Sequence, residues 1–97
     1  MTEAETIISS IESHAEEIRS GFGVARLGVF GSRVRGDATA DSDLDVLVEF
    51  ENPTFRNYMG LKRFLEDLLG MHVDLVSAAA LRPALEPYIR AEVRYVA

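Results

Sequence analysis

Two aspartates, Asp43 and Asp45, stand one residue apart at the start of an apolar run, Leu44 to Phe50. Alternate residues of a β-strand point to the same face, about 7 Å apart, so a strand here places both carboxylates side by side. Adjacent carboxylates repel each other, which favours a bound cation. Aspartate is also a poor strand former, so two of them in one strand are unusual. The alternative is an amphipathic strand whose polar face meets water.

A second feature is the pair Gly31-Ser32, which ends an earlier apolar run. Glycine lets the backbone approach a phosphate closely, and serine adds a hydroxyl beside a possible helix start, where free N–H groups bind anions. Arg33 and Arg35 follow and could neutralise phosphate oxygens. For either arginine alone, a surface ion pair with Asp37 or Asp41 is the simpler interpretation.

A third aspartate, Asp74, interrupts the short apolar run from Met71 to Val76. On its own it could be an exposed residue of an edge strand. Together with Asp43 and Asp45, it supplies three carboxylates from two strands beside a turn suited to phosphate. Mg²⁺ binds oxygen ligands, commonly a few carboxylates together with substrate phosphates. The three aspartates are therefore candidate metal ligands.

The remaining pattern predicts helices and strands that alternate irregularly. Apolar residues recur at helical spacing after Thr2, which fits a capping box with Glu5, and again before Gly70. Mixed order in a short chain indicates an α+β fold, with a small mixed sheet of about three strands and helices packed on it. The expected elements are a helix from Thr2 to about Gly21, a strand over Val24–Phe30, a turn or short helix over Ser32–Ala40, a strand over Leu44–Phe50, a helix over Leu61–Leu69, a strand over Met71–Val76 and a closing helix over Tyr88–Val96.

Length and charge narrow the classes of function. Ninety-seven residues predict a single domain, 1–97, with one small core. A net charge of −6 argues against direct binding of long nucleic acid and suits a divalent cation or a basic protein partner. The sequence has no cysteine, no secretory signal and no apolar run long enough to span a bilayer, so we expect a cytoplasmic protein without membrane contact.

The motifs resemble a known family when they are taken together. Gly31-Ser32-Arg33-Val34-Arg35-Gly36 followed by Ser42-Asp43-Leu44-Asp45 is similar to the signature of the DNA polymerase β-like nucleotidyltransferases. In that family a third aspartate lies on a later strand, the place that Asp74 takes here. The short length and the S-D-x-D form look most like the minimal nucleotidyltransferases, or MNT proteins. These commonly serve as antitoxins paired with HEPN-domain toxins.

The resemblance implies a polymerase β-like fold and a role for each motif residue. Asp43, Asp45 and Asp74 would be the catalytic and metal-binding residues, with two Mg²⁺ ions on a nucleoside triphosphate, most simply ATP. Asp74 would also help to deprotonate the acceptor hydroxyl. The nucleotide-binding residues would be Gly31, Ser32, Arg33, Arg35 and Ser42.

The resemblance also implies a reaction and a partner. The chain would transfer AMP from ATP to a hydroxyl, expected to be a tyrosine, of a cognate HEPN toxin. One small core leaves no second domain to hold an acceptor, which fits an acceptor supplied by another chain. Two alternatives remain open here: an antitoxin that neutralises its toxin by binding alone, and a nucleotidyltransferase that acts on a small molecule.

Overall fold

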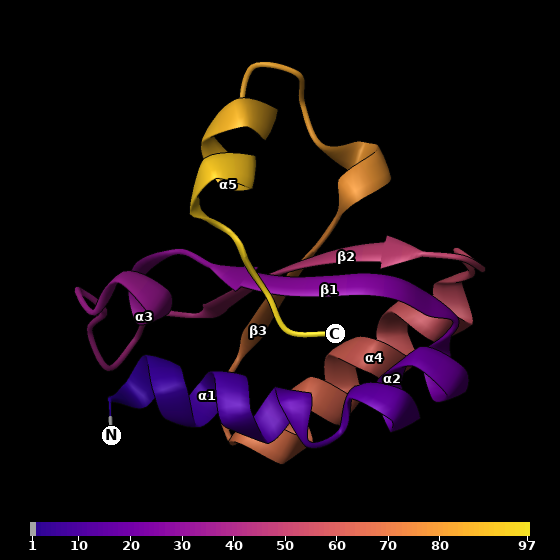
Figure 1. The fold of residues 1–97 in the computed structure, drawn as a ribbon, viewed down its shortest axis with the longest axis horizontal. Coiled ribbons are helices and arrows are strands. Elements are labelled where there is room, and N and C mark those ends of the chain that lie inside the picture. The colour runs from indigo at the N-terminus through magenta and orange to yellow at the C-terminus, as the bar shows by residue number, and fades with distance from the viewer. Residues whose placement is uncertain (1) are drawn as a thin grey trace.

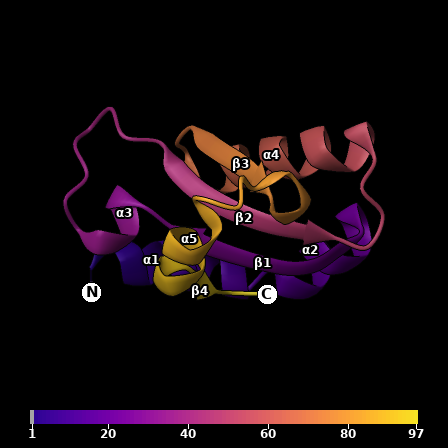
Figure 2. The same ribbon diagram turned by 90° about the horizontal axis from the view of Figure 1, so that it is seen from above.

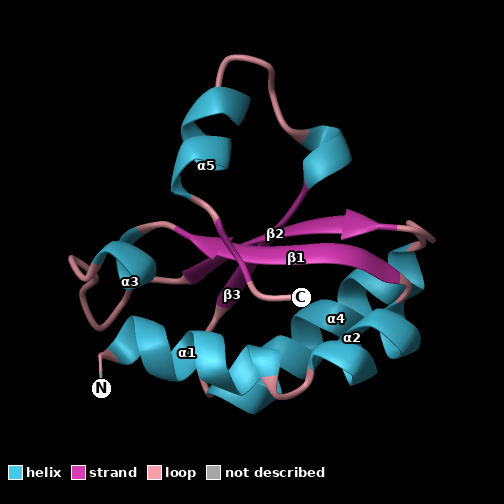
Figure 3. Cartoon of the chain, viewed as in Figure 1, coloured by secondary structure: helices cyan, strands magenta, loops and turns pink. Residues whose placement is uncertain are grey.

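The four strands form one mixed sheet in the order β3-β2-β1-β4, in a computed structural model that describes residues 2–97 (Figures 1 and 3). Strand β1 pairs antiparallel with both β2 and β4, and β2 pairs parallel with β3. The parallel pair is joined across the sheet by α4, as parallel neighbours require. In chain order the elements are α1 (Glu3–Glu12), α2 (Ala15–Phe22), β1 (Val24–Phe30), α3 (Ser32–Arg35), β2 (Leu44–Phe50), α4 (Phe55–Leu69), β3 (Val73–Ser77), the 3₁₀ turn η1 (Ala78–Ala80), α5 (Glu86–Glu92) and β4 (Arg94–Tyr95).

Three helices, α1, α2 and α4, cover one face of the sheet (Figures 1 and 2). Their apolar stripes meet alternate residues of β1, β2 and β3 in a single core, as the helical and strand periodicities of the sequence predict. The residues buried there are Ile7, Ile11, Ile18, Leu61 and Leu65 from the helices and Val24, Leu27, Val29, Leu44, Val46, Val48, Val73 and Leu75 from the strands.

The opposite face of the sheet mixes acidic residues with apolar ones such as Leu47 and Phe30, which are 1% and 9% exposed, and no such helix layer covers it within residues 2–97. Alternation places Asp45 and Glu49 of β2 and Asp74 of β3 on this open face. Helix α5 stands over it at the end of an arm that leaves β3 and returns as β4 (Figure 1). The α+β class, the mixed sheet and the three long strands are confirmed.

The sheet has one short strand besides the three expected, because the chain adds β4 after α5. The closing helix ends at Glu92, and Arg94 and Tyr95 then pair with Val29 and Gly28 of β1. Gly28 makes this approach possible: a Cβ at that position would lie 2.5 Å from Val93 Cγ2 and 3.3 Å from the Arg94 carbonyl oxygen. A two-residue strand that depends on one glycine leaves no periodic pattern in the sequence.

The expected first helix is divided into α1 and α2. Ser13 Oγ donates to the Ser10 carbonyl oxygen at 2.8 Å, and His14 Nδ1 lies 2.8 Å from the same oxygen. Such side-chain bonds to the backbone compete with helix continuation, and the chain bends there. The start of the helix is confirmed, since Thr2 Oγ1 accepts from the Glu5 amide at 3.2 Å.

Helix α4 begins six residues before the expected Leu61. Its N-cap is Thr54, whose Oγ1 accepts from the Asn57 amide at 3.0 Å. The first side chains of this helix are exposed, so the apolar periodicity of the sequence did not indicate its start. No helix within residues 2–97 is long and apolar enough to cross a membrane.

Candidate active site

Asp45 and Asp74 face each other across the parallel strands β2 and β3, where they are register partners. Register partners in a sheet direct their side chains to the same face, here the open one. On its other side Asp45 pairs with Phe30, the last residue of β1, so that the Gly31-Ser32 turn begins beside it. The sheet therefore brings together the second aspartate, the third aspartate and the turn, which are distant in sequence. Asp43 stands two residues before Asp45 and is exposed, as is Asp74 on the edge strand β3.

Gly31 touches Asp45 so closely that no other residue fits. Its φ of 87° lies in the region that favours glycine, and a Cβ built there would overlap Asp45 Oδ2. The glycine of the turn therefore has a second purpose besides backbone freedom: it makes room for the carboxylate. The turn and the aspartate form one unit, which the sequence motif alone did not reveal.

The electrostatics of the site centre on Asp45. Burial is the largest effect that raises the pKa of Asp45, from 3.8 to about 6, and the charge of Asp74 is the second. Asp43 and Glu92 raise this pKa further, while Arg35 opposes them. A half-buried carboxylate with a raised pKa beside two exposed carboxylates is an arrangement typical of functional sites.

A divalent cation fits this group in donor type and in charge. Carboxylate oxygens are the ligands that Mg²⁺ prefers, and a cation would reverse the repulsion around Asp45. Within residues 2–97, however, no three histidine or acidic side chains lie close enough together to form a metal cluster. The three aspartates would therefore have to draw together around an ion.

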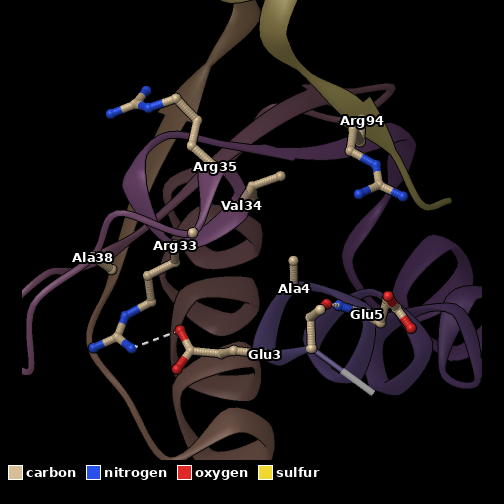
Figure 4. Close-up of a pocket in the computed structure, with 10 residues that line it drawn as sticks. Glu3, Ala4, Glu5, Arg33, Val34, Arg35, Ala38 and Arg94 are labelled. Carbon is tan, nitrogen blue, oxygen red and sulfur yellow. Dashed lines mark hydrogen bonds and ion pairs between the residues drawn. The ribbon is translucent and has the colours of Figure 1, made fainter.

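Arg33 points away from Arg35 and holds the loop between α3 and β2 (Figure 4). Its guanidinium donates to the Ser42 carbonyl oxygen at 2.8 Å, to Glu3 at 2.9 Å and to the Ala40 carbonyl oxygen at 3.4 Å. The side chain is only 11% exposed, and it closes one end of a pocket of about 340 Å³ between α1 and α3. The structure thus gives Arg33 a loop-holding contact; its contact with a nucleotide stays a prediction.

Ser42 also shapes this loop, because its Oγ accepts from the Thr39 amide at 3.0 Å. With Asp43 it lines a second pocket of about 380 Å³ that lies between the loop and the residues before β3. The predicted contact of Ser42 with a nucleotide also stays a prediction. The pocket does place open space directly beside the first aspartate.

Glu92 joins the site from the far end of the chain, and the sequence analysis missed it. Its Oε1 accepts from the Gly31 amide at 2.8 Å and from Arg35 Nη1 at 2.5 Å. Arg35 also forms the expected pair with Asp37, at 3.3 Å. No spacing rule connects residues 57 and 61 positions apart. The only available signal was an acidic residue on the apolar-spaced closing helix.

Known proteins share both the sequence and the fold. A family model described as a nucleotidyltransferase domain matches residues 11–96. The protein adenylyltransferase MntA of Thermococcus cleftensis is 44% identical over 97 residues, which cover 99% of this chain and 98% of that protein. A solved structure described as a minimal nucleotidyltransferase superposes with a TM-score of 0.79 at 39% identity, covering 97% of this chain and 95% of the other.

A more distant likeness extends to a toxin–antitoxin complex. One chain from the solved complex of a tri-AMPylated Shewanella oneidensis HEPN toxin with an MNT antitoxin superposes with a TM-score of 0.64. The identity is 16%, with 93% of this chain and 71% of the other covered. At that identity the match shows a shared fold.

Proposed function

This chain belongs to the nucleotidyltransferase-domain family, and from that premise we propose that it is an antitoxin that adenylylates a HEPN-domain toxin. In this proposal AMP passes from ATP, with Mg²⁺, to a tyrosine hydroxyl of the toxin. The name of the Thermococcus relative supports protein adenylylation, and the Shewanella complex supports a HEPN toxin as the acceptor. One observation of this chain carries the proposal: Asp45 lies between Asp74 and the Gly31-Ser32 turn.

The three aspartates and the Gly31-Ser32 turn each have a chemical role in the proposed reaction. Asp43, Asp45 and Asp74 would hold Mg²⁺, which when bound neutralises charge on the triphosphate and on the transferring phosphoryl group. Ser32 would bind the triphosphate tail through its backbone N–H and its hydroxyl, and Gly31 would let the backbone approach that tail closely. Asp74, which is more exposed than its register partner Asp45, would accept the proton of the acceptor hydroxyl.

The bond changes are those of an in-line displacement. The acceptor oxygen forms a bond to the α-phosphorus of ATP, and the bond from that phosphorus to the bridging oxygen of the β-phosphate breaks. Pyrophosphate leaves with the electron pair of that bond, and AMP remains on the acceptor. Positioning and charge neutralisation supply most of the rate in such reactions, so the protein needs no covalent intermediate.

The open face of the sheet supports an acceptor from another chain. The aspartates lie on the side away from the helix layer, where only the α5 arm stands over the sheet (Figure 2). The net charge of −6 suits a basic partner. We propose further that the chain works as a single domain in the cytoplasm, where ATP and Mg²⁺ are available.

The decisive experiment is transfer of label from α-³²P-ATP to a purified HEPN-domain toxin, with Mg²⁺ present. We expect wild type to label the toxin and the Asp43→Ala, Asp45→Ala double variant to fail. A matched control removes two exposed carboxylates of α2, Glu16→Ala and Glu17→Ala, and should keep full transfer. If wild type labels no more than the aspartate variant, the enzymatic proposal is wrong. Protection of cells by that variant would then favour neutralisation by binding alone.

A further inference from the structure

Glu92 connects the C-terminal arm to the Gly31-Ser32 turn through a single oxygen. Its Oε1 accepts both the Gly31 amide and Arg35 Nη1, so that one carboxylate bridges the first and last residues of the turn that contains α3. The two partners are not equivalent. The first is a backbone N–H, which fixes the Phe30–Gly31 peptide plane, and the second is a charged side chain with several rotamers.

We propose that Glu92 is a positioning residue for the nucleotide: it sets the Gly31-Ser32 turn and aims Arg35 so that both meet the β- and γ-phosphates of ATP. The inference rests on the proposed function. Glu92 acts through the turn and is itself placed outside the phosphate contacts. Nothing in the motif assigns it a role, because the motif ends at Asp74.

The local geometry explains why this turn needs an external anchor. Gly31 adopts a φ of 87° and packs against Asp45 Oδ2, a pair of constraints that an unanchored glycine would readily escape. The Val34 and Arg35 amides already bond to the Gly31 carbonyl oxygen, at 3.1 and 3.0 Å. The N–H is thus the remaining backbone polar group of Gly31, and it donates to Glu92. Ser32 then has its hydroxyl and amide left for a ligand.

Helix α5 itself has no buried residue. The arm is secured by the pairing of β4 with β1, by the buried Val96 and by polar contacts. Arg90 Nη1 donates to Tyr95 Oη at 2.6 Å and to Glu49 at 3.4 Å, and Glu92 supplies the contact to the turn. The charge of Glu92 also raises the pKa of Asp45, and the Gly31 amide and Arg35 are the groups that hold Glu92 beside it.

The test compares Glu92→Ala and Glu92→Gln with the control Glu86→Ala. Glu86 lies on the same helix and pairs only weakly, at 3.7 Å, with Arg90, so its loss alters the arm without touching the turn. Binding of ATP and of AMP is measured by calorimetry in the presence of Mg²⁺, at a temperature where circular dichroism shows every variant folded. Hydrogen exchange of the Gly31 amide is measured on the same proteins without nucleotide.

We expect Glu92→Ala to weaken ATP binding about tenfold or more, the usual effect of losing a charge-assisted hydrogen bond, and to leave AMP binding within about twofold. Glu92→Gln keeps an acceptor oxygen and should restore part of the loss. The Gly31 amide should exchange faster in Glu92→Ala and at the wild-type rate in Glu86→Ala.

Four results would overturn the inference. Unchanged ATP affinity in Glu92→Ala would mean that the contact only fastens the arm to the turn. Tighter ATP binding in that variant would mean that Glu92 competes with the phosphates for the same donors. An equal loss for ATP and AMP would put its effect elsewhere than at the outer phosphates. Wild type that binds no ATP would refute the proposed function and this inference together; active wild type with a normal Glu92→Ala would refute this inference alone.

Discussion

Replacing Asp45 with asparagine should stabilise the metal-free protein while it abolishes transfer. Asparagine keeps the size of the side chain and removes a charge that is half-buried beside Asp74 and Asp43. Raising the pKa of Asp45 from 3.8 to about 6 corresponds to about 3 kcal/mol at neutral pH, at about 1.4 kcal/mol per unit. Solvent screening of a half-buried group reduces this to about 1–1.5 kcal/mol.

The sign follows from proton linkage. The folded protein holds the Asp45 proton more tightly than the unfolded chain does, so the stability of wild type falls as pH rises from 3.8 to about 6. Above pH 6 the full penalty is present, and below 3.8 it is absent because Asp45 is protonated in both states. Asp45→Asn lacks this penalty at every pH, so its advantage should appear only as the pH rises through this window.

Thermal unfolding followed by circular dichroism with a chelator measures the effect. At pH 8 we expect the midpoint of Asp45→Asn to rise by about 4–12 °C, since 1 kcal/mol shifts a domain of this size by about 4–8 °C. Asp43→Asn is the matched control: it removes only one of the lesser causes and should gain less. A midpoint at pH 8 no higher than wild type, or a gain of equal size at pH 3.5, would refute the reasoning.

Three further predictions concern the turn, the cation and a helix cap. Gly31→Ala should lower stability by at least about 1–2 kcal/mol in urea unfolding, because its φ is positive and its Cβ meets Asp45; unchanged stability would mean that the turn can relax. Mg²⁺ should raise the unfolding midpoint of wild type and not of Asp45→Asn, and a chelator should stop transfer; equal shifts would remove the cation from this site. Thr54→Ala should cost about 1 kcal/mol in urea unfolding through loss of the α4 cap. Transfer should stay unchanged, because the cap follows the end of β2 whereas Asp45 lies near the start of that strand, and a loss of transfer would contradict this.

Patterns within single segments of the sequence predicted most of the helices and strands. The alternation from Leu44 to Phe50 and the apolar stripe before Gly70 predicted β2 and most of α4, because each depends on a periodicity within one segment. The errors fell where a side chain overrode the pattern. Ser13 bends the first helix by bonding backward to the Ser10 carbonyl oxygen, a competition that apolar spacing does not record.

The residues of the candidate site, like the elements of the fold, could be predicted only in part. Asp45 and Asp74 could be matched to one sheet face from the sequence, since strand alternation fixes which way each residue points. Glu92 could not be found, because its contact with Gly31 depends on how the α5 arm returns over the sheet. Arg33 was predicted to bind the nucleotide, and its contacts with the loop carbonyls of Ala40 and Ser42 could not be predicted, because both roles give an arginine the same neighbours in sequence.

The position of Asp74 on the outermost strand has a consequence for solubility. A free strand edge exposes backbone donors and acceptors to any other extended chain, and a charged side chain is a common way to discourage such pairing. At the other border of the sheet, β4 is only two residues long and offers little to pair with. An apolar replacement of Asp74 would therefore remove the charge from the longer free edge of the sheet. We expect such a variant to aggregate as well as to lose transfer activity.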